Sequence, residues 1–278
     1  MAIEAGTRIT SAAAHGKHGH SLISEAKFRQ LYELALKTQL AGVRQKRLRG
    51  REAAMAGVAA DLRNDDVVVA ECAASVKDIA RGHVTVPMDR RSFEERVIEA
   101  LGDAVGDRMR KTGRITAIFF DAAPGSKVLQ EARELAIGAK LPVILVEHGP
   151  AKAKRGGSKR GKKAAALEHP SIPVDTQDVI AMYRVAHESI ARAREGSGPT
   201  HVVGVRWQVL TTAKRRAAKQ NAVEHLEEWL TARGLPVQEW RREIVARHKE
   251  SGDGRERGAV DAADSMIEDE DTEARAIA

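Results

Sequence analysis

Two short apolar stretches, residues 115–120 and 141–146, constrain the fold of this chain more than any other feature. Each has the length of a buried strand and is too short to span a membrane. Segments with helical periodicity lie between and around them. We therefore expect an α/β fold in which strand–helix–strand units build a parallel sheet with helices on both faces.

The expected elements alternate along the chain after a long amphipathic helix that begins past Ser24. Strands are expected at residues 67–70, 115–120, 142–146 and 201–207. Helices are expected at residues 52–62, 93–111, 128–139, 179–194, 222–233 and 237–248. Gly57 and its neighbouring alanines permit close helix packing. Ligands of such sheets bind beyond the carboxyl ends of the strands.

The composition agrees with one α/β domain, expected at residues 21–250 between tails at 1–20 and 251–278 that we expect to be disordered. Aromatic residues make up only 3% of the chain, so the core must consist of Ala, Val, Leu and Ile. The single cysteine, Cys72, leaves no intrachain disulfide and no cysteine-rich zinc site. The sequence shows neither a secretory signal nor an apolar run of about 18 residues, so we expect a cytoplasmic protein without a membrane partner.

Asp121 is the most informative polar residue, because it directly follows a buried strand at the edge where ligands bind. Its carboxylate could hold a hard cation such as Mg²⁺, which prefers oxygen ligands and bridges to phosphate. The same residue could instead cap the helix that follows. The residues alone leave these two roles evenly weighted.

The segment 152–163 carries much of the chain's net charge of +7 and could bind phosphate or nucleic acid. Gly156, Gly161 and Lys162 imitate a phosphate loop, but Lys163 replaces the hydroxyl residue that such a loop needs. No aromatic residue is interleaved for base stacking. We interpret the segment as a solvated loop and do not expect nucleic-acid binding.

The chain resembles the α subunit of thiamine-diphosphate-dependent 2-oxoacid dehydrogenases, the first component of the pyruvate and branched-chain complexes. The similarity is clearest in two strand ends and the helix between them, matched by Phe119, Phe120, Asp121, Ala122, Ala123, Glu131, Ala132 and residues 140–144. It continues through residues 172–175, 178–179, Tyr183 and 198–200. The N-terminal half adds residues 50–53, Gly57, Asp65, Asp66 and 80–82, and the C-terminal part adds Glu227, Trp229, Leu230 and 233–235.

The resemblance implies a thiamine-diphosphate-binding fold, with thiamine diphosphate and Mg²⁺ as cofactors. It places Asp121 as metal ligand and Ala122 and Gly149 beside the cofactor. The departures from the family pattern fall on this site: Ala122 replaces a glycine, and Gly149 and Pro150 stand where the family has two asparagines. The segment 72–76 stands where the family carries a diphosphate-binding arginine, and 208–212 replaces its His-Gly-His loop.

These departures predict weakened or lost cofactor binding, since a diphosphate needs a cation and several donors to offset its desolvation. The family reaction is oxidative decarboxylation of a 2-oxoacid with acyl transfer to a lipoyl group. The implied partners are a β-like subunit or a second copy of the chain, and a lipoyl-bearing acyltransferase. The alternative is a non-catalytic scaffold or regulatory subunit with the same fold.

Overall fold

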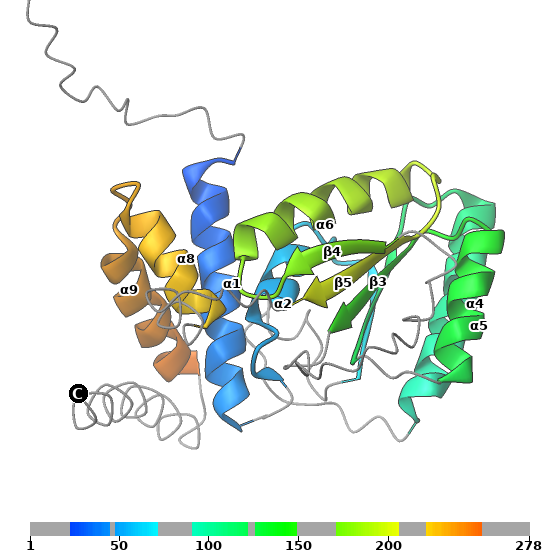
Figure 1. Ribbon diagram of the computed structural model, residues 1–278, viewed down its shortest axis with the longest axis horizontal. Coiled ribbons are helices and arrows are strands. Elements are labelled where there is room, and N and C mark those ends of the chain that lie inside the picture. Colours follow the sequence, from blue (N-terminus) through cyan, green and yellow to red (C-terminus); the bar gives the residue numbers. More distant parts are fainter. Residues whose placement is uncertain are drawn as a thin grey trace, which may run out of the picture.

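The computed structural model describes residues 23–44, 48–71, 91–121, 126–148, 171–205 and 221–251. Its centre is a five-stranded parallel sheet in the order β1-β2-β3-β5-β4 (Figure 1). The strands are β1 (Val67–Ala70), β2 (Thr116–Asp121), β3 (Val143–His148), β4 (Ser171–Asp175) and β5 (Thr200–Val205). The expected α/β fold with a parallel sheet is therefore confirmed.

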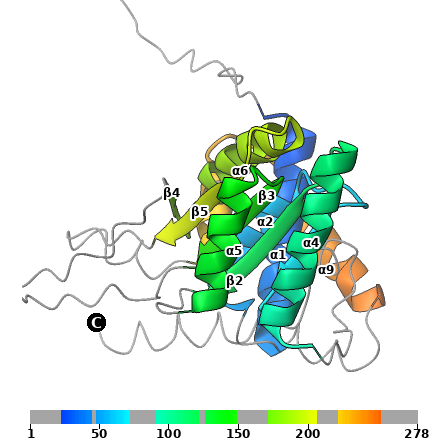
Figure 2. The same ribbon diagram turned by 90° about the vertical axis from the view of Figure 1, so that its right-hand side faces the viewer.

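The helices lie on both faces of the sheet and in a further outer layer (Figures 1 and 2). They are α1 (Glu25–Arg44), α2 (Glu52–Ala59), α4 (Phe93–Arg110), α5 (Lys127–Gly138), α6 (Val179–Arg194), α8 (Ala222–Thr231) and α9 (Val237–Ser251). Helices α4 and α5 cover one face, and α2 and α6 cover the other. Helices α1, α8 and α9 pack outside α2 and α6.

The direction in which the chain crosses the sheet explains this division. Strands β1, β2 and β3 follow one another across the sheet, so right-handed crossovers place α4 and α5 on the same face. From β4 to β5 the chain runs back toward the centre, and the same handedness places α6 on the opposite face. The order therefore reverses between β3 and β5, where ligands of such sheets bind beyond the strand ends.

Alternation along the central strands divides the apolar core into two parts. Ile118 and Phe120 of β2 point to α4 and α5, whereas Ala117 and Phe119 point to the side of α2 and α6. The second side is much the larger, because α1, α8 and α9 extend it beyond the first helix layer. Both faces of β2 and β3 are thus buried, which is why these strands read as continuous apolar runs.

Aromatic residues hold the outer helix layer together despite their scarcity. The rings of Phe28 and Trp229 meet edge to face at 5.2 Å, joining α1 to α8. The Tyr32 hydroxyl donates to the Glu227 carboxylate at 2.6 Å, and Arg241 of α9 donates to the same oxygen at 2.8 Å. Burial, followed by the hydrogen bond to Glu227, raises the pKa of Tyr32, so this phenol stays neutral.

The main correction to the expected elements is β4, which we did not predict. It is an edge strand with Pro173 at its centre and two exposed residues, so it lacks the apolar run that marks a buried strand. Helix α2 ends earlier than expected, and β3 extends further, to His148. The predicted tails lie outside the described residues, except that Ser251 ends α9. No helix among the described residues is long and apolar enough to cross a membrane.

Candidate functional site

Asp121 and His148 are the last residues of β2 and β3 and stand opposite each other in the parallel ladder. They therefore lie side by side at the carboxyl edge of the sheet, on the flank of the point where the strand order reverses. The predicted position of Asp121 at this edge is confirmed. Its alternative role as a helix cap is wrong, because the Ser126 hydroxyl accepts the N–H of Leu129 and caps α5.

The carboxylate of Asp121 is engaged by Arg51, which lies directly before α2. Nη2 of Arg51 donates to Oδ1 of Asp121 in a close ion pair. The arginine side chain is only 7% exposed, whereas that of Asp121 is 48% exposed. The guanidinium thus lies in the protein interior, whereas about half of the surface of the Asp121 side chain is in contact with solvent.

Glu71 contributes a second carboxylate to this edge. It follows β1, and its own N–H continues the ladder by donating to the Phe119 carbonyl at 3.0 Å. Its Oε2 accepts the backbone N–H of Asp121 at 2.9 Å. The ends of β1 and β2 are therefore joined by a side-chain hydrogen bond as well as by a backbone one. These two bonds hold the backbone of Asp121, and so the base of its side chain, in place.

His148 is buried at the end of β3, with 6% of its surface exposed. Its ring stacks on Phe119 at a centroid distance of 6.4 Å, and neither ring nitrogen has a hydrogen-bond partner among the described residues. Burial, followed by the positive charge of Arg51, lowers the pKa of His148 from 6.5 to about 3. The imidazole is therefore neutral near neutral pH.

Glu52, the residue after Arg51, is the second buried polar side chain of this region. It is 4% exposed; Oε1 accepts the N–H of Gly50 at 3.1 Å, and Oε2 has no partner within the described part of the chain. Burial raises the pKa of Glu52, because no cation compensates for its desolvation. The start of α2 thus brings an arginine and a partly satisfied acid to the sheet edge.

The described residues of this edge do not fit a divalent cation. Its most accessible oxygen ligand, the Asp121 carboxylate, is already paired with a guanidinium. No group of three or more His, Cys, Asp or Glu side chains that could hold a metal occurs among the residues described. A Mg²⁺ ion would therefore meet one occupied carboxylate and a fixed positive charge in place of an octahedron of oxygens.

Several predicted site residues fall outside the described part of the chain. These are Ala122, Gly149, Pro150 and the segments 72–76, 152–163 and 208–212. The predictions from the sequence did not include His148 or the pairing of Arg51 with Asp121. His148 lies shortly after an apolar run, as Asp121 does, and this shared position is the signal in the sequence that could have indicated it. That the two residues are direct neighbours follows only from the register of β2 and β3. Nothing local in the sequence indicates that Arg51 meets Asp121.

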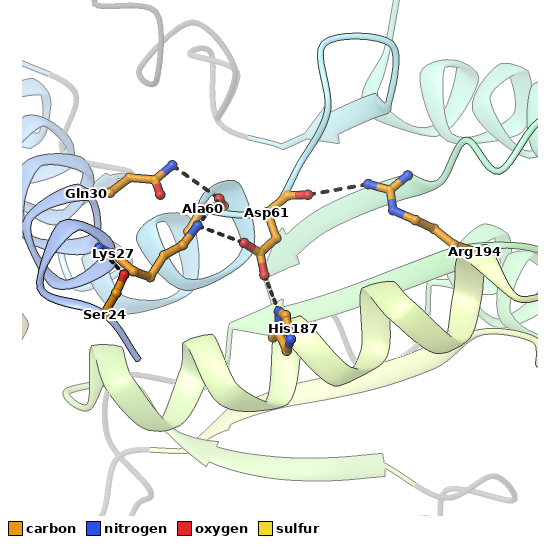
Figure 3. A network of polar contacts seen from close by, with 7 residues as sticks. All are labelled: Ser24, Lys27, Gln30, Ala60, Asp61, His187 and Arg194. Atoms are coloured by element: carbon orange, nitrogen blue, oxygen red, sulfur yellow. Dashed lines mark hydrogen bonds and ion pairs between the residues drawn. The ribbon is translucent and has the colours of Figure 1, made fainter. Parts of the chain in front are cut away.

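A second polar network lies where α1, the end of α2 and α6 meet (Figure 3). Asp61 accepts Lys27 Nζ at 3.0 Å and lies 2.5 Å from Nδ1 of His187. Burial raises the pKa of Asp61, but these two contacts outweigh it and the net pKa is lowered. Both carboxylate oxygens of Asp61 have partners on other helices, so we interpret the network as a structural link between α1, α2 and α6.

Comparison with known proteins agrees with this architecture. The sequence model described as "Dehydrogenase E1 component" matches residues 73–206. The α subunit of acetoin:2,6-dichlorophenolindophenol oxidoreductase from Bacillus subtilis is 30% identical over 141 residues, which cover 46% of this chain and 42% of that subunit. The α subunit of 3-methyl-2-oxobutanoate dehydrogenase from Mycobacterium tuberculosis is 28% identical over 220 residues, covering 68% of this chain and 59% of the relative.

A further relative is the pyruvate dehydrogenase E1 component α subunit of Acholeplasma laidlawii, 28% identical over 140 residues, which cover 47% of this chain and 41% of that subunit. Among solved structures, a transketolase from Pichia stipitis overlaps 82% of this chain and 47% of its own, with a TM-score of 0.42 and 11% identity. At that score the overlap adds nothing to the fold described above.

The fold and the edge site define an α/β protein with a parallel sheet and a polar cluster at its carboxyl edge. Within that class, the chain is similar to α subunits of 2-oxoacid dehydrogenase first components, and the resemblance inferred from its sequence is confirmed. The alignments cover less than two thirds of each relative's own length.

Proposed function

We propose that this chain is an α-subunit-like member of the 2-oxoacid dehydrogenase first-component family whose binding of thiamine diphosphate is weakened or lost. When bound, thiamine diphosphate supplies the nucleophilic carbon for decarboxylation of a 2-oxoacid. The pairing of Asp121 with Arg51 is the single observation that carries the proposal. The ion pair engages the Asp121 carboxylate, which is the one carboxylate that the resemblance assigns as a metal ligand.

The other groups at the edge support the same conclusion. A diphosphate is multiply anionic and needs donors or cations that are free to meet it. The charge of Arg51 is paired with Asp121, His148 is neutral, and the nearby side chains of Glu71 and Asp121 are carboxylates. Loss of one charge-assisted hydrogen bond costs about 1.5–3 kcal/mol, which corresponds to roughly one to two decades of affinity.

Isothermal titration of the full chain with thiamine diphosphate in the presence of Mg²⁺ tests the proposal. We expect binding weaker than micromolar, with thiamine titrated as a control for contacts that do not involve the diphosphate. Micromolar or tighter binding that requires the diphosphate would contradict the weakened site and favour an active cofactor-dependent subunit.

The second candidate is a non-catalytic scaffold or regulatory subunit that pairs with a β-like subunit or with a second copy of itself. It is favoured by the contrast between an intact core on both sheet faces and an edge whose metal ligand is occupied. Light scattering on the purified chain should then give a dimer or larger species, or a co-expressed β-like subunit should co-purify. A monomer at micromolar concentration that captures no such subunit would contradict this candidate.

A further inference from the structure

We infer that Arg51 acts as a built-in counter-cation for Asp121, so that this carboxylate is closed to divalent metal ions. The inference deepens the proposed function and rests on it, because it names the residue that turns a metal ligand into half of an internal ion pair. It concerns the chain's own side chains and requires no bound cofactor.

Arg51 is held in place by its backbone as well as by its charge. Its N–H donates to the Leu48 carbonyl at 3.1 Å, and its own carbonyl accepts the N–H of Met55 at 2.9 Å in the first turn of α2. The side chain is 7% exposed, and guanidinium does not lose its proton in proteins. The positive charge is therefore permanent and cannot move to solvent without unpacking the start of α2.

Replacing the ion pair by a metal would be unfavourable on two grounds. A divalent ion bound to Asp121 would lie next to the fixed guanidinium, and the two positive charges would repel each other. If the metal displaced the guanidinium, Arg51 would become a buried charge without its partner. Its Nη1 already lacks a hydrogen-bond partner within the described residues, so no alternative acceptor stands ready.

Without that positive charge, the half-exposed Asp121 carboxylate would lose its paired cation and be open to another one. Oε2 of Glu71 accepts the N–H of Asp121, and the neutral ring of His148 stands opposite Asp121 in the ladder. A freed carboxylate is an oxygen ligand that suits Mn²⁺, with water as a further ligand. Removing the charge of Arg51 should therefore create divalent-ion binding that the natural chain lacks.

Electron paramagnetic resonance of free Mn²⁺ titrated with the purified full chain tests this directly. We expect the natural chain to bind Mn²⁺ weakly, with no change in the Asp121→Asn variant. The Arg51→Gln variant should bind one Mn²⁺ about tenfold or more tightly, and Arg51→Gln combined with Asp121→Asn should lose that gain. The Arg51→Lys variant keeps the charge and is the matched control that should behave like the natural chain.

Two results would overturn the inference. The first is tight Mn²⁺ binding by the natural chain that Asp121→Asn abolishes; the second is no gain in a folded Arg51→Gln variant. If Arg51→Gln does not fold, the comparison of the natural chain with Asp121→Asn still tests the inference. An accessible Asp121 site would appear as Mn²⁺ binding that the Asp121→Asn variant loses. Because Mn²⁺ alone is the probe, this experiment does not depend on whether the chain binds thiamine diphosphate. The isothermal titration described above measures that binding separately.

Discussion

Buried polar residues at the carboxyl edge differ sharply in how well they are compensated. Arg51 has a carboxylate partner, whereas His148 is buried with neither ring nitrogen bonded among the described residues. Burying a polar group without a partner costs stability and is tolerated where the structure around it is otherwise fixed. His148 is fixed by the β2–β3 ladder and by its stacking on Phe119.

This burial predicts a pH dependence of stability that belongs to His148. Its pKa is about 3 in the folded chain and near 6.5 when unfolded, so between these values the unfolded chain binds the additional proton. The free energy of unfolding should therefore fall as the pH drops below about 6.5. Between about pH 7 and pH 5.5 the natural chain should lose roughly 1 kcal/mol more than the His148→Gln variant.

Urea denaturation of both proteins at the two pH values measures this difference. Glu52, whose pKa is raised by burial, titrates in both proteins and so cancels in the comparison. Equal slopes of stability against pH in the natural chain and the variant would show that the imidazole is reached by solvent protons in the folded state.

At the scale of elements, the closest helix contact is between α2 and α6. A methyl group added at Gly57 would lie 2.7 Å from Cγ of Met182 and 2.8 Å from the backbone nitrogen of Tyr183. The side chain of Met182 can adjust, but the backbone of α6 cannot move without shifting the whole helix. The expectation that small residues in this helix permit close packing is confirmed.

Gly57→Ala should therefore lower the free energy of unfolding by about 2 kcal/mol, since overpacking outweighs the gain in helix propensity. Gly102→Ala in α4 is the matched control, because a methyl group there has no atom within 4 Å. That variant should raise stability by up to about 1 kcal/mol through propensity alone. Thermal denaturation of both variants measures the two effects, and similar melting temperatures would mean that α2 and α6 are not in close contact.

At the scale of the whole molecule, the two edges of the sheet have different roles. At the amino edge, the fully buried Asp66 carboxylate accepts the N–H of Ile115 at 3.0 Å and two nitrogens of Arg194 at 3.0 and 2.7 Å. Arg194 also donates to the Gly113 carbonyl and to the Asp61 carbonyl, and Figure 3 shows the contact with Asp61. The entry to β1, the entry to β2 and the end of α6 thus meet in one network. At the opposite edge, Arg51 and His148 keep buried nitrogens without a hydrogen-bond partner among the described residues.

That contrast agrees with the general division of parallel α/β folds, in which ligand sites lie at the carboxyl ends of the strands. Satisfied ion pairs at the amino edge fix the arrangement of the layers. Incompletely satisfied side chains at the carboxyl edge are retained although each one costs stability.

The sequence by itself determined the α/β class, the positions of most elements and the place of Asp121 at a strand end. It did so because an element that is buried on one or both faces has a characteristic spacing of apolar residues. The edge strand β4 lacks such a pattern, since it is half exposed and contains Pro173. Short apolar runs and capping residues could therefore be read directly, and an exposed edge strand could not.

Only the tertiary structure decided what surrounds Asp121. Arg51 is 70 positions away in the chain, and His148 becomes its neighbour through the register of β2 and β3. Such contacts depend on how α2 docks and how the strands align, which are set by the packing of the whole core. Charge and burial at the site follow from that packing, and they turn a carboxylate suited to a metal into the partner of an arginine.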